Sequence, residues 1–285
     1  MASQLFRFAQ IEVPWPFGPD DGRYVVRRHA GEQPEHVLVL ATLGAPQRRL
    51  LRGKRAKNAE PEPDPTPVPT GRATIIPAAP LETEKDAARW LKDADGETEI
   101  EAALVVLNRA LHAHRVALAD PHAREVGRDD ALVARIGFGV GEQVAEGRWA
   151  EALTLPVPQD RRQRRVAALR PQERVAALLS GRDVALACEL LVLRARADLD
   201  AGRQREAALQ LRVALDTALA ELPAWAERGD LPARIKELAG FVDPAAAVAA
   251  TALERGLDVD EAEEIERILG RLEAALRART AAGFA

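Results

Sequence analysis

The sequence predicts an α+β protein, in which a small antiparallel β module at the N-terminus precedes a mainly α-helical C-terminal body. Three observations lead to this prediction. Short runs rich in Val, Ile and Phe, separated by turn-forming residues, occupy the first 45 residues. Apolar residues recur at spacings of three and four over most of the chain after residue 81. Between these regions, residues 46–71 carry a basic run followed by prolines at alternate positions.

The predicted β module spans residues 1–45. Strands are expected at 5–13, 23–29 and 36–43, and the segment between the first two is dense in Pro, Gly and Asp. The third run is apolar on both faces, which indicates a central strand covered from both sides. Because three strands bury little apolar surface, this antiparallel meander must pack on another part of the chain. A fourth strand at 72–77 is a candidate to complete it.

Residues 46–71 are predicted to link the two regions. Residues 47–57 contain six cations and no acid, and prolines follow at 61, 63, 65, 67 and 69. Alternating proline favours polyproline II, which has no internal hydrogen bonds and rises about 3.1 Å per residue. Such a segment acts as a spacer or a tether and does not form a core.

Residues 81–285 form the predicted helical domain. Apolar periodicity places helices at 82–93, 98–119, 171–180, 182–201, 204–222, 243–256 and 259–279. Asp243 and Pro244 are typical of a helix start, and Gly202 is typical of a helix end. Residues 131–141 fit either a strand or a helix, because a short apolar run has no decisive period.

Composition excludes several classes of protein. The chain has one cysteine, Cys188, so it cannot be a disulfide-stapled scaffold, and the thiol is expected to lie inert among Leu residues of a helix. Charged residues interrupt every apolar run before the roughly 20 residues that a membrane span needs. The N-terminus lacks the order of a secretory signal. We therefore expect a soluble cytoplasmic protein with no membrane partner.

The most specific pattern lies at about residues 188–219, in a predicted helical hairpin. Its small and apolar positions and its turn glycine are Ala195, Gly202, Ala207, Leu211, Ala214 and Leu215. This pattern resembles a single tetratricopeptide (TPR) repeat, in which small residues let two antiparallel helices approach closely. It departs from the family at Asp198, where a Tyr is usual. The resemblance implies a helical surface that binds another protein; an ordinary helix pair in a bundle is the alternative.

Residues 147–152 begin like a second such repeat. Pro156 and Pro158 break its continuation, and the two fragments lie 202 − 147 = 55 positions apart, whereas a regular array repeats about every 34.

A histidine-rich segment supplies the candidate metal ligands, which are His112, His114, Asp120 and His122. Residues two apart on a helix do not share a face, so His114 should be half-buried and His112 should face outward. No established zinc spacing is present. The sequence therefore predicts neither a bound metal nor a cofactor.

Two further patterns have both a functional and a structural interpretation. Gly137–Gly141 resembles a phosphate loop only in its glycine content, and the same glycines would serve close packing or a bend. Arg161, Arg164 and Arg165 share one side of a helix and are the candidate residues for binding an acidic partner. No aromatic residues alternate with them to stack on bases, and the net charge of −4 disfavours nucleic acid.

These observations favour a non-enzymatic protein–protein interaction or scaffold protein that uses a helical-hairpin groove. One alternative is a metal- or phosphate-dependent enzyme that uses the segment 112–125 and the loop Gly137–Gly141. The other is nucleic-acid binding through the Arg-rich runs. A homo-oligomer is compatible with the apolar stripe of the last helix.

Overall fold

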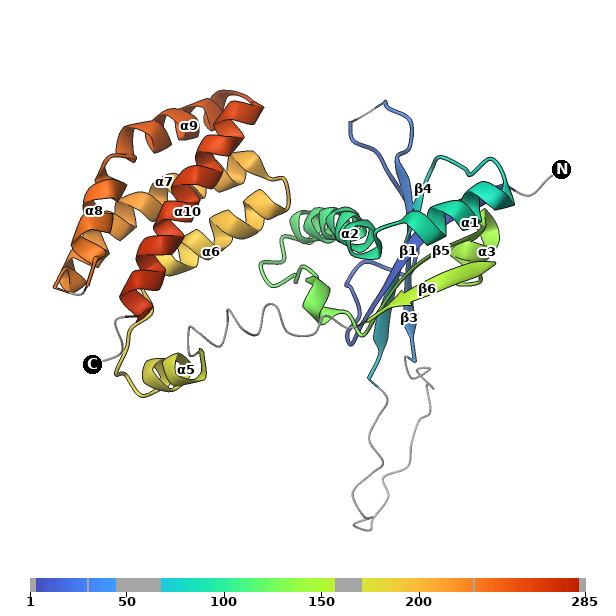
Figure 1. Ribbon diagram of the computed structural model, residues 1–285, viewed down its shortest axis with the longest axis horizontal. Helices are drawn as coiled ribbons and strands as arrows, with labels where there is room; N and C mark the ends of the chain where they lie inside the picture. Colours follow the sequence, from blue (N-terminus) through green and yellow to red (C-terminus); the bar gives the residue numbers. More distant parts are fainter. Residues whose placement is uncertain (1–3, 30, 45–67, 157–170, 228, 282–285) are drawn as a thin grey trace, which may run out of the picture. The chain divides into compact units, whose positions relative to one another are not determined.

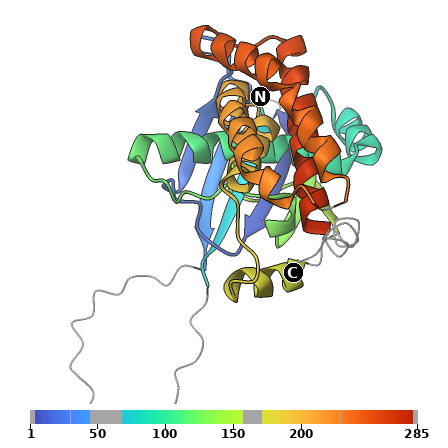
Figure 2. The same ribbon diagram turned by 90° about the vertical axis from the view of Figure 1, so that its left-hand side faces the viewer.

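The computed structural model describes residues 4–29, 31–44, 68–156, 171–227 and 229–281 (Figures 1 and 2). The chain divides into two compact units, residues 1–159 and residues 160–285. The first unit combines an antiparallel sheet with helices, and the second is helical. The predicted α+β class is therefore confirmed.

The first unit is built on a six-stranded antiparallel sheet. In spatial order its strands are β2 (Gly22–Val26), β3 (His36–Leu43), β4 (Thr70–Pro77), β1 (Leu5–Val13), β5 (Val133–Val140) and β6 (Glu151–Leu155). β1 lies in the middle, where Ala9 faces Ile75 of β4 on one side and Ile136 of β5 on the other. Its side chains are mostly buried on both faces, as a central strand requires.

The predicted strands exist, but the predicted meander is wrong in its order. β3 and β4 separate β1 from β2, because the residues after β1 cross the end of β4 and do not form a tight hairpin. The backbone N–H of Gly71 donates to the carbonyl of Trp15 at 3.0 Å and holds this crossing in place. A Cβ on Gly71 would lie 2.4 Å from the same oxygen, so only glycine permits the close approach.

Strands β5 and β6 differ from the prediction that residues 81–285 form a helical domain. The ambiguous run 131–141 is a strand that pairs with β1, so it belongs to the first unit. Residues 147–152, read as the start of a repeat helix, form a turn and the beginning of β6. Gly147 has φ +79°, in the left-handed region that ends a helix, and this explains the correction.

Helices cover both faces of the sheet. Helices α1 (Glu84–Asp93) and α2 (Gly96–Leu118) pack on one face through Leu91, Ile100 and Leu107. Their N-termini are capped by the side chains of Thr83 and Asp95. The short helix α3 (Gly141–Ala145) lies on the opposite face, where Val144 joins a separate apolar cluster.

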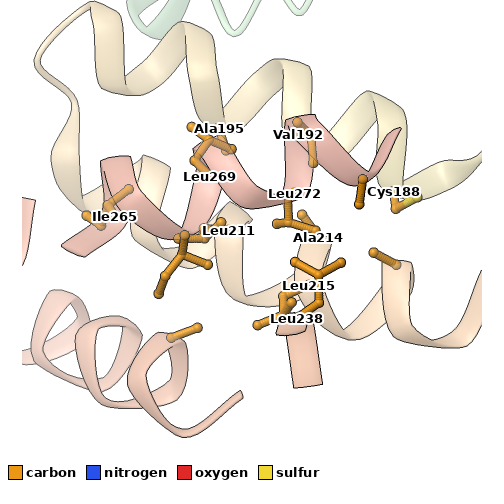
Figure 3. Close-up of a cluster of buried hydrophobic side chains, with 14 of the residues drawn as sticks. Cys188, Val192, Ala195, Leu211, Ala214, Leu215, Leu238, Ile265, Leu269 and Leu272 are labelled. Carbon is orange, nitrogen blue, oxygen red and sulfur yellow. The ribbon is translucent and has the colours of Figure 1, made fainter. Parts of the chain in front are cut away.

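The second unit is a helical bundle with one core. Its elements are α5 (Pro171–Leu179), α6 (Ala187–Asp200), α7 (Gln204–Glu221), the 3₁₀ turn Leu222–Trp225, α8 (Leu231–Ala239), α9 (Val242–Glu254) and α10 (Val259–Ala281). Figure 3 shows Leu269 and Leu272 of α10 beside Ala195 and Val192 of α6, and all four belong to the same buried cluster. The helices predicted after residue 171 are therefore present, with shifted ends.

The helical hairpin predicted near 188–219 is formed by α6 and α7. Gly202 makes the reversal with φ +73°, and Ala195, Ala207 and Ala214 are fully buried between the helices. Asp198, which stands where a repeat would have Tyr, accepts a 2.6 Å hydrogen bond from Arg203 at the turn. Small buried residues thus line the contact between α6 and α7.

The two 23-residue helices α2 and α10 both carry charges along their length. Across the described parts of the chain, no helix is long and apolar enough to cross a membrane.

Candidate functional site

A hollow of about 750 Å³ lies in the first unit, between helix α2 and the edge strand β2. Its lining residues come from the turn before β2, from β2 itself, from β3 and from α2; they are Gly18, Pro19, Asp20, Tyr24, Val25, Val26, Arg27, Leu40, Arg109, Ala110, Ala113, His114, Ala117 and Leu118. The volume falls in the range of about 300–1,000 Å³ that is typical of binding pockets. We call this hollow the α2–β2 groove.

Small side chains on α2 create the groove. Ala110, Ala113 and Ala117 recur at helical spacing and line the hollow on its α2 side. On the neighbouring side of the same helix, Leu107 and Leu111 reach the sheet and are buried. Because a methyl group cannot fill the distance that a leucine fills, space remains along α2 over β2 and β3.

The turn before β2 closes one end of the groove. Gly18 has φ +104°, and a Cβ there would lie 3.0 Å from Nε2 of His114. The Tyr24 hydroxyl donates to the carbonyl of Asp20 at 2.6 Å. Glycine at this position therefore allows the turn to approach α2, and it places the half-buried imidazole of His114 at the groove wall.

Arg27 and Arg109 line the other end of the groove. Nη2 of Arg109 donates to the carbonyl of Arg28 at 3.1 Å and also to that of Arg27, which fixes the end of β2 to α2. Nε of Arg27 donates to the carbonyl of Glu32 at 3.0 Å. Among the described residues, these two guanidinium groups bond to backbone carbonyl oxygens and to no carboxylate. This end of the groove is therefore positive.

Strand β2 offers a free edge beside the groove. Within the described residues β3 is its one neighbour in the sheet. The carbonyl of Val26 accepts a 2.9 Å hydrogen bond from the N–H of Glu35, so the polar backbone groups of Val26 point toward the β3 side. Since these groups alternate along a strand, those of Arg23 and Val25 point away from the sheet. Val25 is 53% exposed.

The candidate metal ligands do not converge. His114 is half-buried, as predicted, and Asp120 accepts a hydrogen bond from the backbone N–H of His122 at 2.9 Å. No group of three or more potential metal ligands comes together among the residues that the structure describes.

The expectation that His112 faces outward is wrong, because its side chain is half-buried and its Nδ1 is covered without a hydrogen-bond partner. Asn108, one turn earlier on α2, bonds to both the N–H and the carbonyl of Val126 at 2.8 and 2.9 Å. The chain that leads to Val126 therefore passes over this side of the helix.

The glycines of Gly137–Gly141 serve close packing. A Cβ on Gly137 would lie 2.4 Å from the carbonyl oxygen of Glu151, and one on Gly139 would lie 3.0 Å from Cα of Trp149. On Gly141 it would lie 3.0 Å from the ring of Phe6. Residues 137–140 belong to strand β5 and Gly141 begins α3, so the predicted loop does not exist, and close packing accounts for all three glycines.

Cys188 is buried at the start of α6, as predicted. Burial, together with a hydrogen bond to Glu221, raises the pKa of this thiol to about 12. The carboxylate of Glu221 also accepts the backbone N–H groups of Ala187 and Cys188 at 3.1 and 3.0 Å, and so caps α6. Arg161, Arg164 and Arg165 lie outside the described residues.

The inner face of the α6–α7 hairpin is covered by α10. Nε of Arg196 donates to Glu273 at 2.7 Å, and its Nη1 donates to Glu266 at 2.6 Å, which ties α6 to α10. On the outer side of α6, Leu190 and Leu193 are 55% and 65% exposed. Any surface that this hairpin offers to another protein is therefore the outer one.

A polar cluster on the α3 face of the sheet is a second arrangement of charged residues. Glu12 pairs with Arg72 at 3.0 Å and with Arg135 at 3.7 Å, and Arg135 stacks on Trp149 with 5.0 Å to the ring centre. The carboxylate joins residues of three adjacent strands, so the cluster fixes the sheet.

Comparisons of the chain with models of known protein families, with curated proteins and with solved structures gave no match. The function must therefore be argued from the geometry. The α2–β2 groove was not among the sites predicted from sequence, although the recurrence of alanine at 110, 113 and 117 was a visible signal.

Proposed function

We propose that this chain is a non-enzymatic protein-interaction protein, and that its α2–β2 groove receives an apolar side chain of a protein partner. The observation that carries the proposal is the juxtaposition of an apolar hollow with a strand that, among the described residues, is paired along one edge only. Recognition of extended peptides commonly combines these two features, because the edge supplies backbone hydrogen bonds and the pocket supplies side-chain selectivity.

The chemistry of the groove favours binding over catalysis. Its polar side chains are Asp20, Tyr24, His114 and the two arginines. Asp, Tyr and His can act as nucleophiles, but the Tyr24 hydroxyl is engaged with the carbonyl of Asp20. Asp20 and His114 line the groove, but no hydrogen bond between them is present among the described contacts. The residues therefore suit the orientation of a bound segment.

The helical unit supplies a second surface in this proposal. The resemblance of α6–α7 to a tetratricopeptide repeat supports a scaffold role, and the hairpin exposes the apolar residues Leu190 and Leu193 of α6 and Val213 of α7. A protein with two binding surfaces on separate units can bring two partners together. The proposal also retains the expectation of a cytoplasmic location.

A matched pair of variants tests the role of the groove. Ala113→Trp fills the groove from α2, whereas Ala220→Trp adds the same side chain at an exposed position of α7 in the other unit. Each full-length chain serves as bait, and retained proteins are quantified by mass spectrometry after circular dichroism has established equal folding. We expect a set of proteins that wild type and Ala220→Trp retain in equal amounts. The amount that Ala113→Trp retains should be lower by about tenfold or more, which corresponds to about 1.4 kcal/mol of binding free energy. Equal retention by all three chains would show that the groove binds no protein.

A further inference from the structure

We infer that the partner segment binds as an extended strand that adds antiparallel to the free edge of β2, with an acidic side chain two residues before the apolar one. The inference rests on the proposed function and specifies its mode and its partner chemistry. It assigns β2 as the template, the α2–β2 groove as the pocket for the apolar side chain, and Arg27 with Arg109 as the contacts of the acid.

The backbone of β2 is suited to strand addition. The outward N–H and C=O groups of Arg23 and Val25 can each form a pair of hydrogen bonds with an added strand. The start of the strand is held by Asp21, whose carboxylate accepts the N–H and the hydroxyl of Thr42, both at 2.8 Å. Its end is held by the Arg109 contacts described above. The edge is therefore fixed at both ends before a partner arrives, which lowers the entropy cost of binding.

The alternation of side chains connects the edge with the groove. Tyr24 and Val26 lie on the α2 face of the sheet, because they pair with Leu38 and His36 in the register that buries Leu38 and Leu40 under α2. In an added strand, every second side chain points to this same face. One of them can therefore enter the groove above the alanines of α2, next to Tyr24, which is 36% exposed.

For an antiparallel partner, the distribution of charge along β2 fixes the order of the acidic and the apolar residue. Arg27 and Arg109 lie at the end of β2, whereas Asp20 precedes its start. An antiparallel strand enters at the arginine end, so an acidic residue that meets the arginines comes earlier in the partner than the residue seated in the groove. The two side chains share one face and are thus two residues apart. A guanidinium–carboxylate contact is the strongest pairing open to these arginines.

The test uses three fluorescent seven-residue peptides built on Thr and Val. The first has Glu two residues before Leu, the second has Lys in place of that Glu, and the third has Glu two residues after Leu. Binding to the full-length chain is measured by fluorescence anisotropy. We expect the first peptide to bind about tenfold more tightly than either of the others. In an N-methyl scan of the first peptide, methylation should abolish binding at alternate positions and be tolerated between them.

Variants of the protein provide the second arm. Val25→Pro removes an outward N–H, and an edge strand tolerates proline, whereas Val25→Thr keeps the N–H as the control. We expect Val25→Pro to bind the first peptide at least about tenfold more weakly than Val25→Thr does, because the two variants change the same side chain but only proline removes the N–H. Circular dichroism verifies the fold of both variants, and Arg109→Gln should remove the preference for Glu over Lys.

Three results would overturn the inference. In the first, Ala113→Trp abolishes peptide binding, but neither N-methylation of the peptide nor Val25→Pro weakens it. That result would refute strand addition and leave the groove as the interaction site. Absence of binding by all three peptides, with partner capture that still depends on Ala113, would refute the acidic chemistry. In the third, sedimentation equilibrium shows a dimer that Val25→Pro dissociates and that the peptides do not disrupt. That result would assign the β2 edge to a second copy of the chain.

Discussion

Removal of the Arg279 side chain of α10 is expected to weaken the helical unit strongly. It is 2% exposed, and its Nη2 donates to Asp183 at 2.7 Å and to the carbonyl of Val184 at 3.1 Å. Its guanidinium stacks on Trp225, with 4.5 Å to the ring centre, and its Nη1 lies 3.5 Å from Glu189. The substitution Arg279→Ala removes all of these contacts and leaves two carboxylates in a buried site.

The structure sets the expected size of this effect. Breaking a buried ion pair by removing one partner costs about 3–5 kcal/mol. The lower end applies here, because Asp183 keeps a 3.2 Å contact with Arg174 and Glu189 keeps a 3.0 Å bond from the N–H of Leu186. We therefore expect a loss of about 3 kcal/mol in the free energy of unfolding. With a urea dependence of about 2 kcal/mol per molar, the midpoint falls by about 1.5 M.

Pulse-labelling hydrogen exchange along a urea series measures this loss within the full chain. Peptides from α6 and α10 report on the helical unit, and peptides from β1 and β5 report on the sheet as an internal reference. Arg277→Ala is the matched control, because Arg277 lies on the same helix with a 55% exposed side chain and a 3.7 Å contact to Glu273. It should change stability by no more than about 0.5 kcal/mol. Equal shifts in the two variants would refute the reasoning.

Further predictions concern the pH response, two glycines and the buried thiol. Burial opposes ionisation of Asp183 and Glu221, but hydrogen bonds outweigh it and hold the pKa of each carboxyl below its ordinary value of 3.8 or 4.5. Their stabilisation is complete above the unfolded pKa and is lost as pH falls through the folded pKa. The urea midpoint of the helical unit should therefore hold down to about pH 5 and fall as the pH passes below 4.5 and then 3.8, and it should fall less in Glu221→Gln. Gly137→Ala places a Cβ 2.4 Å from a backbone oxygen of β6 and should expose that strand to limited proteolysis. Gly270→Ala in α10, with open space around it, should raise the free energy of unfolding of the helical unit by about 0.5–1 kcal/mol. Cys188 should react with Ellman's reagent only after denaturation, because its thiolate is scarce and covered; rapid reaction of the native chain would contradict this.

Local pattern was sufficient for most elements of the fold. Periodicity predicted a stripe on α2 made of Ile100, Leu104, Leu107, Leu111, His114 and Leu118. The first four side chains are buried and His114 is half-buried, but Leu118 at the helix end is 62% exposed. The order of the strands could not be predicted from the sequence, because β1 pairs with β5 across more than a hundred residues and no local pattern identifies that partner. β6 was missed because residues 147–152 have a composition that a helix tolerates, and only its pairing with β5 decides otherwise.

The candidate site could not be predicted for a related reason. Candidate sites are found in a sequence from reactive and charged side chains, whereas the α2–β2 groove results from the small size of three alanine side chains. A hollow exists only once a second element faces the small residues, and the facing strand β2 lies far away in the sequence. The burial of His112 has a similar origin, since the chain that covers it comes from beyond the end of α2.

The central position of β1 has a consequence for synthesis on the ribosome. β1 ends at Val13, and β5, which covers one of its edges, ends at Val140, so 140 − 13 = 127 residues separate the two. At about 5–20 residues per second, translation of that stretch takes roughly 6–25 s. During this interval the nascent chain carries an apolar strand with an unpaired edge, which is a template for aggregation. Chaperones that shield emerging chains should therefore raise the yield of this protein.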